Sequence, residues 1–249
     1  MSTSEQVAFI TGANRGLGLE TARGLGELGV TVLIGSRDAA KGEQAAAGLK
    51  KKGLKAEAVG FDVTNREDHK RLAALLEKRF GRLDILVNNA GIARDGEDFG
   101  KPFNTTSTVT EAALRETFDT NFFAVVALTQ TLLPLIRKAP AGRIVNLSSV
   151  LGSLTLHSDP KSPIYDKKAF AYDASKTALN AFSVHLAVEL RDTRIKVNSA
   201  HPGWVKTEMG GDAAPLEVSE GGKTSVQLAT LPDDGPTGGY FHLGEALPW

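Results

Sequence analysis

The sequence predicts an α/β fold, a doubly wound parallel sheet of about seven strands with helices on both faces. Short β-branched apolar runs alternate along the chain with longer segments in which apolar residues recur at the helical period. The short runs are apolar almost throughout, as is typical of strands that are buried on both faces of a parallel sheet. Regular alternation of this kind, with right-handed crossovers, forms doubly wound sheets.

The first third of the chain supplies four expected strands and three expected helices. Strands are expected at 7–10, 30–34, 56–61 and 83–87, and helices at 17–28, 39–52 and 72–80. Gly29, Gly53 and Gly81 follow the three helices directly. Glycine readily adopts the left-handed conformation that ends a helix, so these positions set the helix boundaries.

The rest of the chain continues the alternation with longer helices. Strands are expected at 142–147, 195–200 and 239–243, and helices at 111–137, 169–191 and, as a weaker pattern, 218–231. No internal repeat, low-complexity tract or linker interrupts this order. Residues 1–249 are therefore expected to form one domain.

Composition restricts the classes of function. The 249 residues include 29 basic and 29 acidic side chains, so the charge balance indicates neither a nucleic-acid nor a membrane partner. The chain has no cysteine and its five histidines show no ligand spacing, so no metal site is expected. The longest apolar run, 122–128, is far shorter than the roughly 18–20 residues that span a bilayer. The N-terminus lacks a signal pattern, and a cytoplasmic location is expected.

Three irregular stretches, 93–108, 157–168 and 203–215, each follow an expected strand. Their glycine, proline and charged residues are typical of surface loops. In a parallel sheet all three lie at the carboxyl edge, where doubly wound proteins bind ligands. We therefore expect these loops, 157–168 and 203–215 above all, to line a substrate pocket.

A glycine-rich segment, Thr11-Gly-Ala-Asn-Arg-Gly-Leu-Gly18, joins the first expected strand to the first helix. Gly12 permits a tight turn, Gly16 allows the backbone to approach a pyrophosphate, and Gly18 allows close packing of helix on strand. The helix N-terminus offers unpaired N–H groups and a positive dipole end to phosphates. After the first strand of a βαβ unit, this segment predicts a dinucleotide site.

The end of the second strand discriminates between the two nicotinamide cofactors. An NAD site usually has a carboxylate there for the ribose 2′-hydroxyl, whereas here Ser36 and Arg37 come first. Arg37 and Arg15 suit a 2′-phosphate, because a guanidinium group binds phosphate in a bidentate manner. Asp38 is also placed to bind a ribose, which keeps NAD open. The sequence favours NADPH/NADP+ over NAD.

Six short motifs follow one another along the chain. They are Thr11 to Gly18, Asn88-Asn89-Ala90-Gly91, Asn121, Ser148-Ser149, Tyr172-Asp-Ala-Ser-Lys176 and Pro202-Gly203. In this order they resemble the classical short-chain dehydrogenase/reductase (SDR) family, and the Asn-Phe-Phe at 121–123 and the C-terminal tryptophan are similar to its carbonyl-reductase-like subgroup. The resemblance covers about residues 6–243. It implies a Rossmann-like fold and a nicotinamide-dependent oxidoreductase.

The resemblance and the glycine segment together imply a set of functional residues. The expected catalytic residues are Asn121, Ser149, Tyr172 and Lys176. Cofactor binding falls to Gly12, Asn14, Arg15, Gly16, Leu17, Gly18, Ser36, Arg37, Asp62, Val63, Asn88, Ala90, Gly91, Tyr172, Lys176, Pro202, Gly203, Val205 and Thr207.

Tyr172 and Lys176 lie four residues apart on an expected helix and therefore share a face. A phenol, with a pKa near 10, needs a shift of roughly three units, about 4 kcal/mol, to exchange protons readily at neutral pH. A cation at ~4 Å supplies a similar energy. Burial opposes the shift, so the charge of the cofactor is expected to help Lys176 to tune Tyr172. The rival phenol, Tyr165, has Ala169 instead of a lysine four positions on.

The resemblance gives three further polar residues their roles. Ser149 is expected to hydrogen-bond the substrate carbonyl, although spacing does not exclude Ser148. Asn121 is expected to hold a water of a proton relay. Asp62 is similar to the family aspartate near the adenine, but aspartate is also a common turn residue. Asn88 and its neighbour are alternatively strand-end caps.

The chain departs from the family pattern before Tyr172. Residues 149 and 172 are 23 positions apart, more than is typical of the family, and the extra residues fall in 157–168. Monomeric carbonyl reductases have a longer insertion at this place. By analogy it covers helix faces that other members use to associate, so a monomer and a homo-oligomer both remain open.

The leading prediction is an NADPH-dependent carbonyl reductase that transfers hydride to a ketone or an aldehyde. Ile92, Trp204 and Met209 are expected to line an apolar substrate pocket. One alternative is an NAD-dependent alcohol dehydrogenase, against which Ser36 and Arg37 argue. The other is a protein that senses the cofactor without turnover, against which the intact catalytic set argues.

Overall fold

A computed structural model describes residues 5–96 and 104–249 of the chain. Eight strands form one sheet in the order β3-β2-β1-β4-β5-β6-β7-β8. They are β1 (Val7–Ile10), β2 (Thr31–Ser36), β3 (Ala56–Gly60), β4 (Ile85–Asn88), β5 (Arg143–Leu147), β6 (Lys196–Ala200), β7 (Tyr240–His242) and β8 (Glu245–Ala246). Strands β1 to β7 are parallel, and β8 pairs antiparallel with β7. The predicted doubly wound parallel sheet is confirmed, and β8 is a short edge strand beyond the seven expected.

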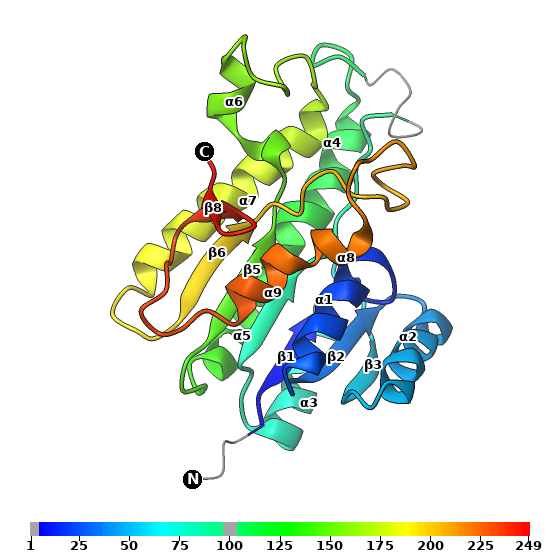
Figure 1. The fold of residues 1–249 in the computed structure, drawn as a ribbon, viewed down its shortest axis with the longest axis vertical. Coiled ribbons are helices and arrows are strands. Elements are labelled where there is room, and N and C mark those ends of the chain that lie inside the picture. Colours follow the sequence, from blue (N-terminus) through cyan, green and yellow to red (C-terminus); the bar gives the residue numbers. More distant parts are fainter. Residues whose placement is uncertain (1–4, 97–103) are drawn as a thin grey trace.

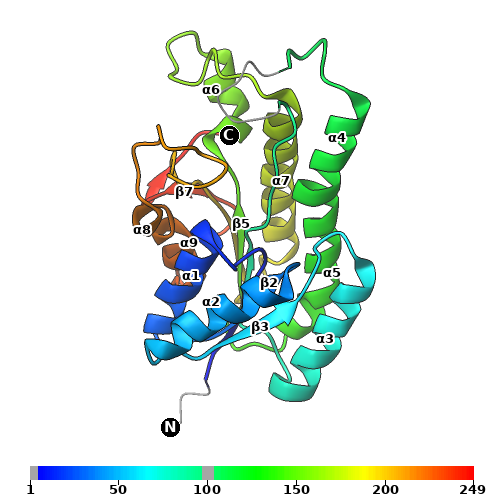
Figure 2. The same ribbon diagram turned by 90° about the vertical axis from the view of Figure 1, so that its right-hand side faces the viewer.

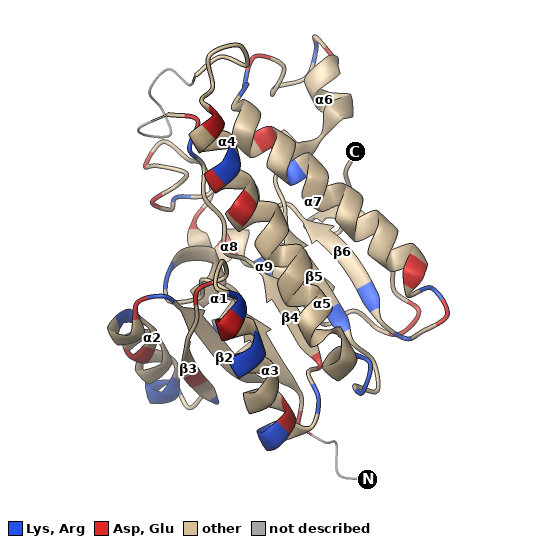
Figure 3. Cartoon of the chain, turned by 180° about the vertical axis from the view of Figure 1, so that it is seen from behind, with Lys and Arg blue, Asp and Glu red and all other residues tan. Residues whose placement is uncertain are grey.

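Helices cover both faces of the sheet (Figures 1 and 2). One face carries α1 (Gly16–Glu27), α2 (Ala39–Lys51), α8 (Val218–Gly221) and α9 (Lys223–Ala229). The other, seen from behind in Figure 3, carries α3 (Arg66–Phe80), α4 (Glu111–Phe118), α5 (Ala124–Ile136) and α7 (Phe170–Glu189). The short α6 (Leu154–Ser158) lies beyond the carboxyl edge of the sheet.

Side chains of β1 alternate between the two cores. Ala8 and Ile10 pack with the buried residues of α1 and α2, while Val7 and Phe9 pack with those of α3, α5 and α7. Successive side chains of a strand point to opposite faces, so an unbroken apolar run satisfies both layers. The apolar composition of the strands thus follows from their burial on two sides.

The helix expected at 111–137 is interrupted by a π-helical turn. Helices α4 and α5 are joined by this turn at Asp119–Phe123, which contains the buried Asn121. Single π turns inside helices occur frequently at functional sites. The stretch Glu111–Ile136 is also long and apolar enough, by length and composition alone, to cross a membrane. Its apolar residues, Leu128 and Leu132 among them, pack in the core beneath the sheet, which accounts for its hydropathy.

The helix expected at 218–231 consists of two short helices, α8 and α9. The loop expected at 157–168 begins within α6 and buries Ile164. Within the stretch 203–215, Val205 forms a short parallel bridge with Leu216. Of the stretch 93–108, residues 97–103 lie outside the described part of the chain. All three stretches leave the carboxyl edge, after β4, β5 and β6.

Candidate active site

The glycine segment lies between β1 and α1, beside the point where the strand order reverses between β1 and β4. Gly12 and Gly16 adopt left-handed φ angles of 62° and 54°. A Cβ on Gly18 would lie 2.5 Å from Asn89 Nδ2 and 2.8 Å from Ala13 Cα, so this position has no room for a side chain. Among the described residues no side chain caps α1, and its N-terminus remains available to an anion. The segment therefore fits a dinucleotide pyrophosphate.

Asn89 and Thr11 hold the glycine segment in place. Asn89 Nδ2 donates to the carbonyl of Thr11 at 2.7 Å and to that of Gly12 at 3.2 Å. The Thr11 hydroxyl accepts from the backbone N–H groups of Asn89 and Ala90, both at 2.9 Å. For Asn89 the sequence offered only a strand-end cap, and for the Thr11 side chain it indicated no role. The Asn-Asn-Ala-Gly motif was the signal for Asn89, but its partner is 77 residues away along the chain.

The polar side chains at the end of β2 differ in their exposure and in the hydrogen bonds that they form within the chain. Ser36 is buried and donates to the carbonyl of Asp38 at 2.7 Å, while Arg37 is exposed. The Asp38 carboxylate caps α2 by accepting from the backbone N–H of Lys41 at 3.0 Å, and this hydrogen bond lowers the pKa of Asp38. The carboxylate that kept NAD open is therefore already engaged in a helix cap.

Arg15 forms an ion pair with Glu208, from the loop after β6. Both side chains are mostly exposed. The pair joins the two sides of the expected cofactor groove, because Thr207 also approaches the glycine segment, with its Cγ2 at 3.7 Å from a Cβ on Gly16. The sequence did not predict a role for Glu208, because only the folded chain brings its loop beside the glycine segment.

The side chains of Asp62 and Asn88, which were expected to contact the cofactor beyond the pyrophosphate, form hydrogen bonds within the protein. Asp62 accepts from the backbone N–H and the hydroxyl of Thr64, at 2.9 and 2.8 Å, which makes it the turn residue that the sequence also allowed. The Asn88 side chain points into the core, where it donates to Asn146 at 2.8 Å and to Thr129 at 3.2 Å. Any cofactor contact of Asn88 is thus left to its backbone.

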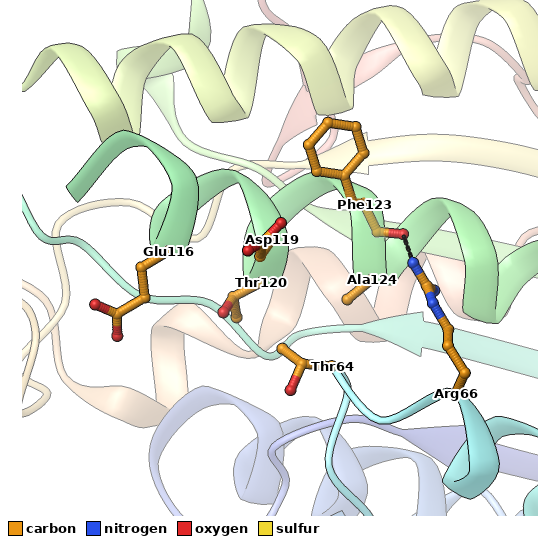
Figure 4. A pocket seen from close by; sticks show the side chains of 7 residues that line it. All are labelled: Thr64, Arg66, Glu116, Asp119, Thr120, Phe123 and Ala124. Atoms are coloured by element: carbon orange, nitrogen blue, oxygen red, sulfur yellow. Dashed lines mark hydrogen bonds between the residues drawn. The ribbon is translucent and has the colours of Figure 1, made fainter. Parts of the chain in front are cut away.

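A cavity of about 500 Å³ opens between the segment after β3 and the α4–α5 helix (Figure 4). Its lining comprises Thr64, Arg66, Glu116, Asp119, Thr120, Phe123 and Ala124. A smaller hollow shares Thr120 and Ala124 with it and also includes the predicted cofactor residues Val63, Asn88 and Ala90. The hollows include Thr64 and Val63 respectively, which follow Asp62, so both lie near the expected adenine end of the groove.

The structure distinguishes between the two serines after β5. The Ser149 side chain is hydrogen-bonded to that of Tyr172 and also caps the following turn at Leu151. The Ser148 hydroxyl is buried and has no hydrogen-bond partner in the described part of the chain. The rival phenol, Tyr165, is 38% exposed, whereas Tyr172 is 8% exposed. Ser149 and Tyr172 are therefore the pair that this fold brings together.

Lys176 and Asn121 lie close together beside Gly91. A Cβ on Gly91 would be 3.4 Å from both the Lys176 Nζ and the Asn121 Oδ1. Asn121 Oδ1 accepts from the backbone N–H of Ile92 at 2.9 Å, and its Nδ2 donates to the Ile92 carbonyl at 2.8 Å and to Ser175 at 3.0 Å. Asn121 thus ties the π-helical turn to the segment after β4 and to α7.

Burial dominates the protonation of Tyr172 and Lys176. It raises the pKa of Tyr172 to about 12, against the Ser149 hydrogen bond, and lowers the pKa of Lys176 to about 8. The expected lowering of the Tyr172 pKa by Lys176 is therefore not found in the chain alone. The Lys176 Nζ lies over the phenol ring, 5.5 Å from its centroid, and donates to the Leu147 carbonyl at 2.7 Å.

The loop after β6 is anchored by histidine and glycine. His201 Nδ1 accepts from the backbone N–H of Val150 at 3.1 Å, and burial lowers the pKa of His201 to about 3. This neutral imidazole therefore holds the residue that follows Ser149, a role that the sequence did not suggest. Gly203 has a φ of 87°, and a Cβ there would lie 2.3 Å from Leu216 Cδ1. The predicted Pro202, Val205 and Thr207 belong to the same anchored loop.

The family model described as short chain dehydrogenase matches residues 6–217. The chain belongs to the short-chain dehydrogenase family. The family predicted from the six motifs is confirmed.

Relatives of this short-chain dehydrogenase include carbonyl reductases. It is 32% identical over 287 residues to NADPH carbonyl reductase 1 of Mus musculus, with 100% of both chains covered. It is 30% identical to (+)-neomenthol dehydrogenase of Capsicum annuum, with 98% of both covered. NADPH-bound carbonyl reductase from chicken fatty liver superposes with a TM-score of 0.83 at 29% identity, covering 98% of this chain and 99% of that one. The predicted carbonyl-reductase-like subgroup is also confirmed.

Proposed function

We propose that this short-chain dehydrogenase is an NADPH-dependent carbonyl reductase that converts a ketone or an aldehyde to an alcohol. The observation that carries the proposal is the hydrogen bond between Ser149 and the buried Tyr172, with Lys176 over the phenol ring. Bound NADPH supplies the hydride to the carbonyl carbon. The protein supplies the proton and the groups that orient the substrate.

In this proposal Ser149 and Tyr172 both donate hydrogen bonds to the carbonyl oxygen of the substrate. Negative charge develops on that oxygen as its carbon is reduced, and two hydroxyl donors that are already oriented stabilise the charge without reorganisation. Tyr172 gives up its proton to the oxygen. Burial alone makes Tyr172 too weak an acid, so a neighbouring positive charge has to assist it.

Lys176 and Asn121 form the return path of the proton. The relay water of the proposal would be held near Gly91, where the Lys176 Nζ and the Asn121 Oδ1 lie close together. A Lys176 pKa of about 8 allows this amine to exchange protons near neutral pH. The Asn121 side chain acts by keeping the segment at Ile92 in place.

Three features support NADPH as the cofactor. The carbonyl reductases that the chain resembles are named for NADPH. Arg15 lies in the glycine segment and Arg37 directly follows β2, where a 2′-phosphate would be bound. The Asp38 carboxylate, which an NAD site would direct to the ribose, caps α2 instead. The pocket expected from Ile92, Trp204 and Met209 favours a hydrophobic carbonyl compound.

The test compares turnover of NADPH and NADH with a panel of aromatic ketones, α-keto esters and aldehydes, followed by cofactor absorbance. We expect NADPH-selective reduction, and a loss of about 10²–10⁴-fold in kcat for Tyr172→Phe with cofactor affinity retained. Tyr165→Phe is the matched control, because it removes the same hydroxyl from an exposed phenol. Comparable turnover in Tyr172→Phe and wild type would contradict the proposal. Cofactor binding without turnover of any compound would favour the sensing alternative.

A further inference from the structure

The N-terminus of α7 contacts two buried carboxylates, Asp95 from the segment after β4 and Asp173 from α7 itself. Asp95, which is fully buried, accepts from the backbone N–H of Ala171 at 2.6 Å and from that of Tyr172 at 3.0 Å. Asp173, 8% exposed, accepts from the backbone N–H of Ala169 at 2.9 Å. One carboxylate therefore holds the main chain of the proposed proton donor, and the other is its neighbour in sequence.

Two residues of the insertion before Tyr172, Lys168 and His157, form a hydrogen-bonded pair that reaches Asp173. Lys168 Nζ lies 3.0 Å from His157 Nδ1, and His157 Nε2 lies 3.3 Å from Asp173 Oδ2. An ammonium group only donates, so Nδ1 accepts and the imidazole proton resides on Nε2. That proton faces the Leu151 carbonyl, at 3.0 Å, and the Asp173 carboxylate. The burial and the neighbouring Lys168 lower the pKa of His157, in agreement with a neutral ring.

The neighbours of Asp173 have opposing effects on its pKa. Burial and the nearby Asp95 raise the pKa of Asp173 to about 7, while the Ala169 hydrogen bond and Lys168 lower it. Its Oδ1 is buried and has no hydrogen-bond partner among the described residues. When Asp173 is charged, its field raises the pKa of Tyr172. The titratable and charged groups around Asp173 are thus Asp95, His157 and Lys168, and the charge of Asp173 acts in turn on the Tyr172 phenol.

We propose that Asp173 is a positioning residue that tunes Tyr172 as a proton donor, with Asp95 as its fixed negative neighbour and the Lys168–His157 pair as its counter-charge. The inference rests on the proposed role of Tyr172. It gives the insertion at 157–168 a task in the reaction besides shaping the pocket. Ionisation of Asp173 places a negative charge beside the phenol and makes it a weaker acid.

The first test observes Asp173 directly, without turnover. Aspartate labelled with ¹³C at the carboxyl carbon is titrated by NMR in the intact protein. We expect one carboxyl signal to titrate near neutral pH, to be absent in Asp173→Asn, and to titrate at higher pH in Lys168→Met, which removes the cation. Lys167→Met is the matched control, since that lysine is exposed and has no part in the chain to Asp173. An Asp173 signal that titrates in the ordinary aspartate range would overturn the inference.

The second test is the pH profile of kcat for ketone reduction. We expect an inflection near neutral pH in the wild type that moves upward in Lys168→Met, stays in Lys167→Met and disappears in Asp173→Asn. Asparagine keeps the carbonyl that accepts from Ala169, so the helix terminus is preserved. The alkaline limit that reflects Tyr172 should also move to lower pH in Asp173→Asn, because a negative charge has been removed. Profiles that are identical in wild type and Asp173→Asn would reject the inference.

These outcomes separate the inference from the proposed function. If Tyr172→Phe is inactive and Asp173→Asn retains the wild-type profile, the carbonyl reductase proposal stands and only the role of Asp173 falls. If Tyr172→Phe retains turnover, both fall. If Asp173→Asn does not fold, Lys168→Met alone decides, because its substitution lies outside α7 and leaves both carboxylates in place.

Discussion

The two ends of the site are built in different ways. At the glycine segment, neighbouring residues form a strand, a turn and a helix terminus, and the backbone itself supplies the donors for phosphate. At Tyr172, the decisive side chains come from three separate segments: Asp95 after β4, His157 and Lys168 in the insertion, and Asp173 on α7. Backbone donors need only a local conformation, whereas buried charges need partners that the whole fold brings together. Local sequence patterns therefore predict the first end, whereas at the second end they predict Tyr172 and Lys176 but not the buried carboxylates around them.

The largest effect is expected at the Tyr172 end of the site, for a substitution of Asp95. Asp95→Ala leaves two buried N–H groups of α7 without their charged acceptor, at a cost of about 3 kcal/mol. We expect thermal unfolding to occur about 6–12 °C lower, at roughly 2–4 °C per kcal/mol for a chain of this size. The kcat should fall as well, because Tyr172 loses its main-chain anchor. Asp166→Ala, at an exposed aspartate of the insertion, is the control and should unfold as the wild type does. Equal unfolding temperatures for the two variants would refute this account.

A smaller effect is expected at the glycine end. In Gly18→Ala the new methyl group would lie 2.5 Å from Asn89 Nδ2 and 2.8 Å from Ala13 Cα, so α1 has to shift, at a cost of about 1–3 kcal/mol. Cofactor affinity should fall with it. The control is Gly48→Ala in α2, where nothing lies within 4 Å, and which should stabilise the protein by roughly 0.5–1 kcal/mol. Denaturant unfolding measures the change in stability of each variant, and cofactor titration measures the change in affinity. The comparison fails if the two substitutions change stability in the same direction.

The smallest expected effect concerns the ion pair that joins the two sides of the groove. Glu208→Gln releases Arg15 for the 2′-phosphate, and the affinity for NADPH should rise by about two- to fivefold, as suits an exposed pair. The affinity for NADH, which lacks that phosphate, should not change. Asp212→Asn in the same loop is the control. Titration at low and high salt checks the cause, because screening should remove the gain. An equal gain for both cofactors would show that Glu208 acts on the loop and not through Arg15.

The pH dependence of the Tyr172 end follows from its pKa values with a definite sign. Burial and Asp95 raise the pKa of Asp173 to about 7, so the folded protein holds a proton that the unfolded chain releases near pH 4. This group therefore favours the folded state at low pH, and its contribution is lost as pH rises toward 7. The glycine segment contains no buried acid and contributes no such dependence. The difference again reflects backbone donors at one end and buried charges at the other.

Local sequence patterns determined the fold and the chemical character of the groove. Apolar runs such as 7–10 predicted strands with two buried faces, and glycines such as Gly12 predicted a conformation that other residues rarely adopt. The spacing of Tyr172 and Lys176 predicted a shared helix face. These properties depend on neighbours within a few residues of the chain, so they can be inferred without knowing what packs against them.

The tertiary structure determined the contacts between segments that are far apart in the sequence. It paired Ser149 with Tyr172, turned the Asn88 side chain into the core, and placed the Lys176 Nζ over the phenol ring. It also brought Asp95 to the N-terminus of α7, 76 residues further along the chain. Burial and electrostatic interaction vary with surroundings that only the packed chain creates. For that reason the pKa of Tyr172 lies above that of a free phenol, although the sequence predicted a shift in the opposite direction.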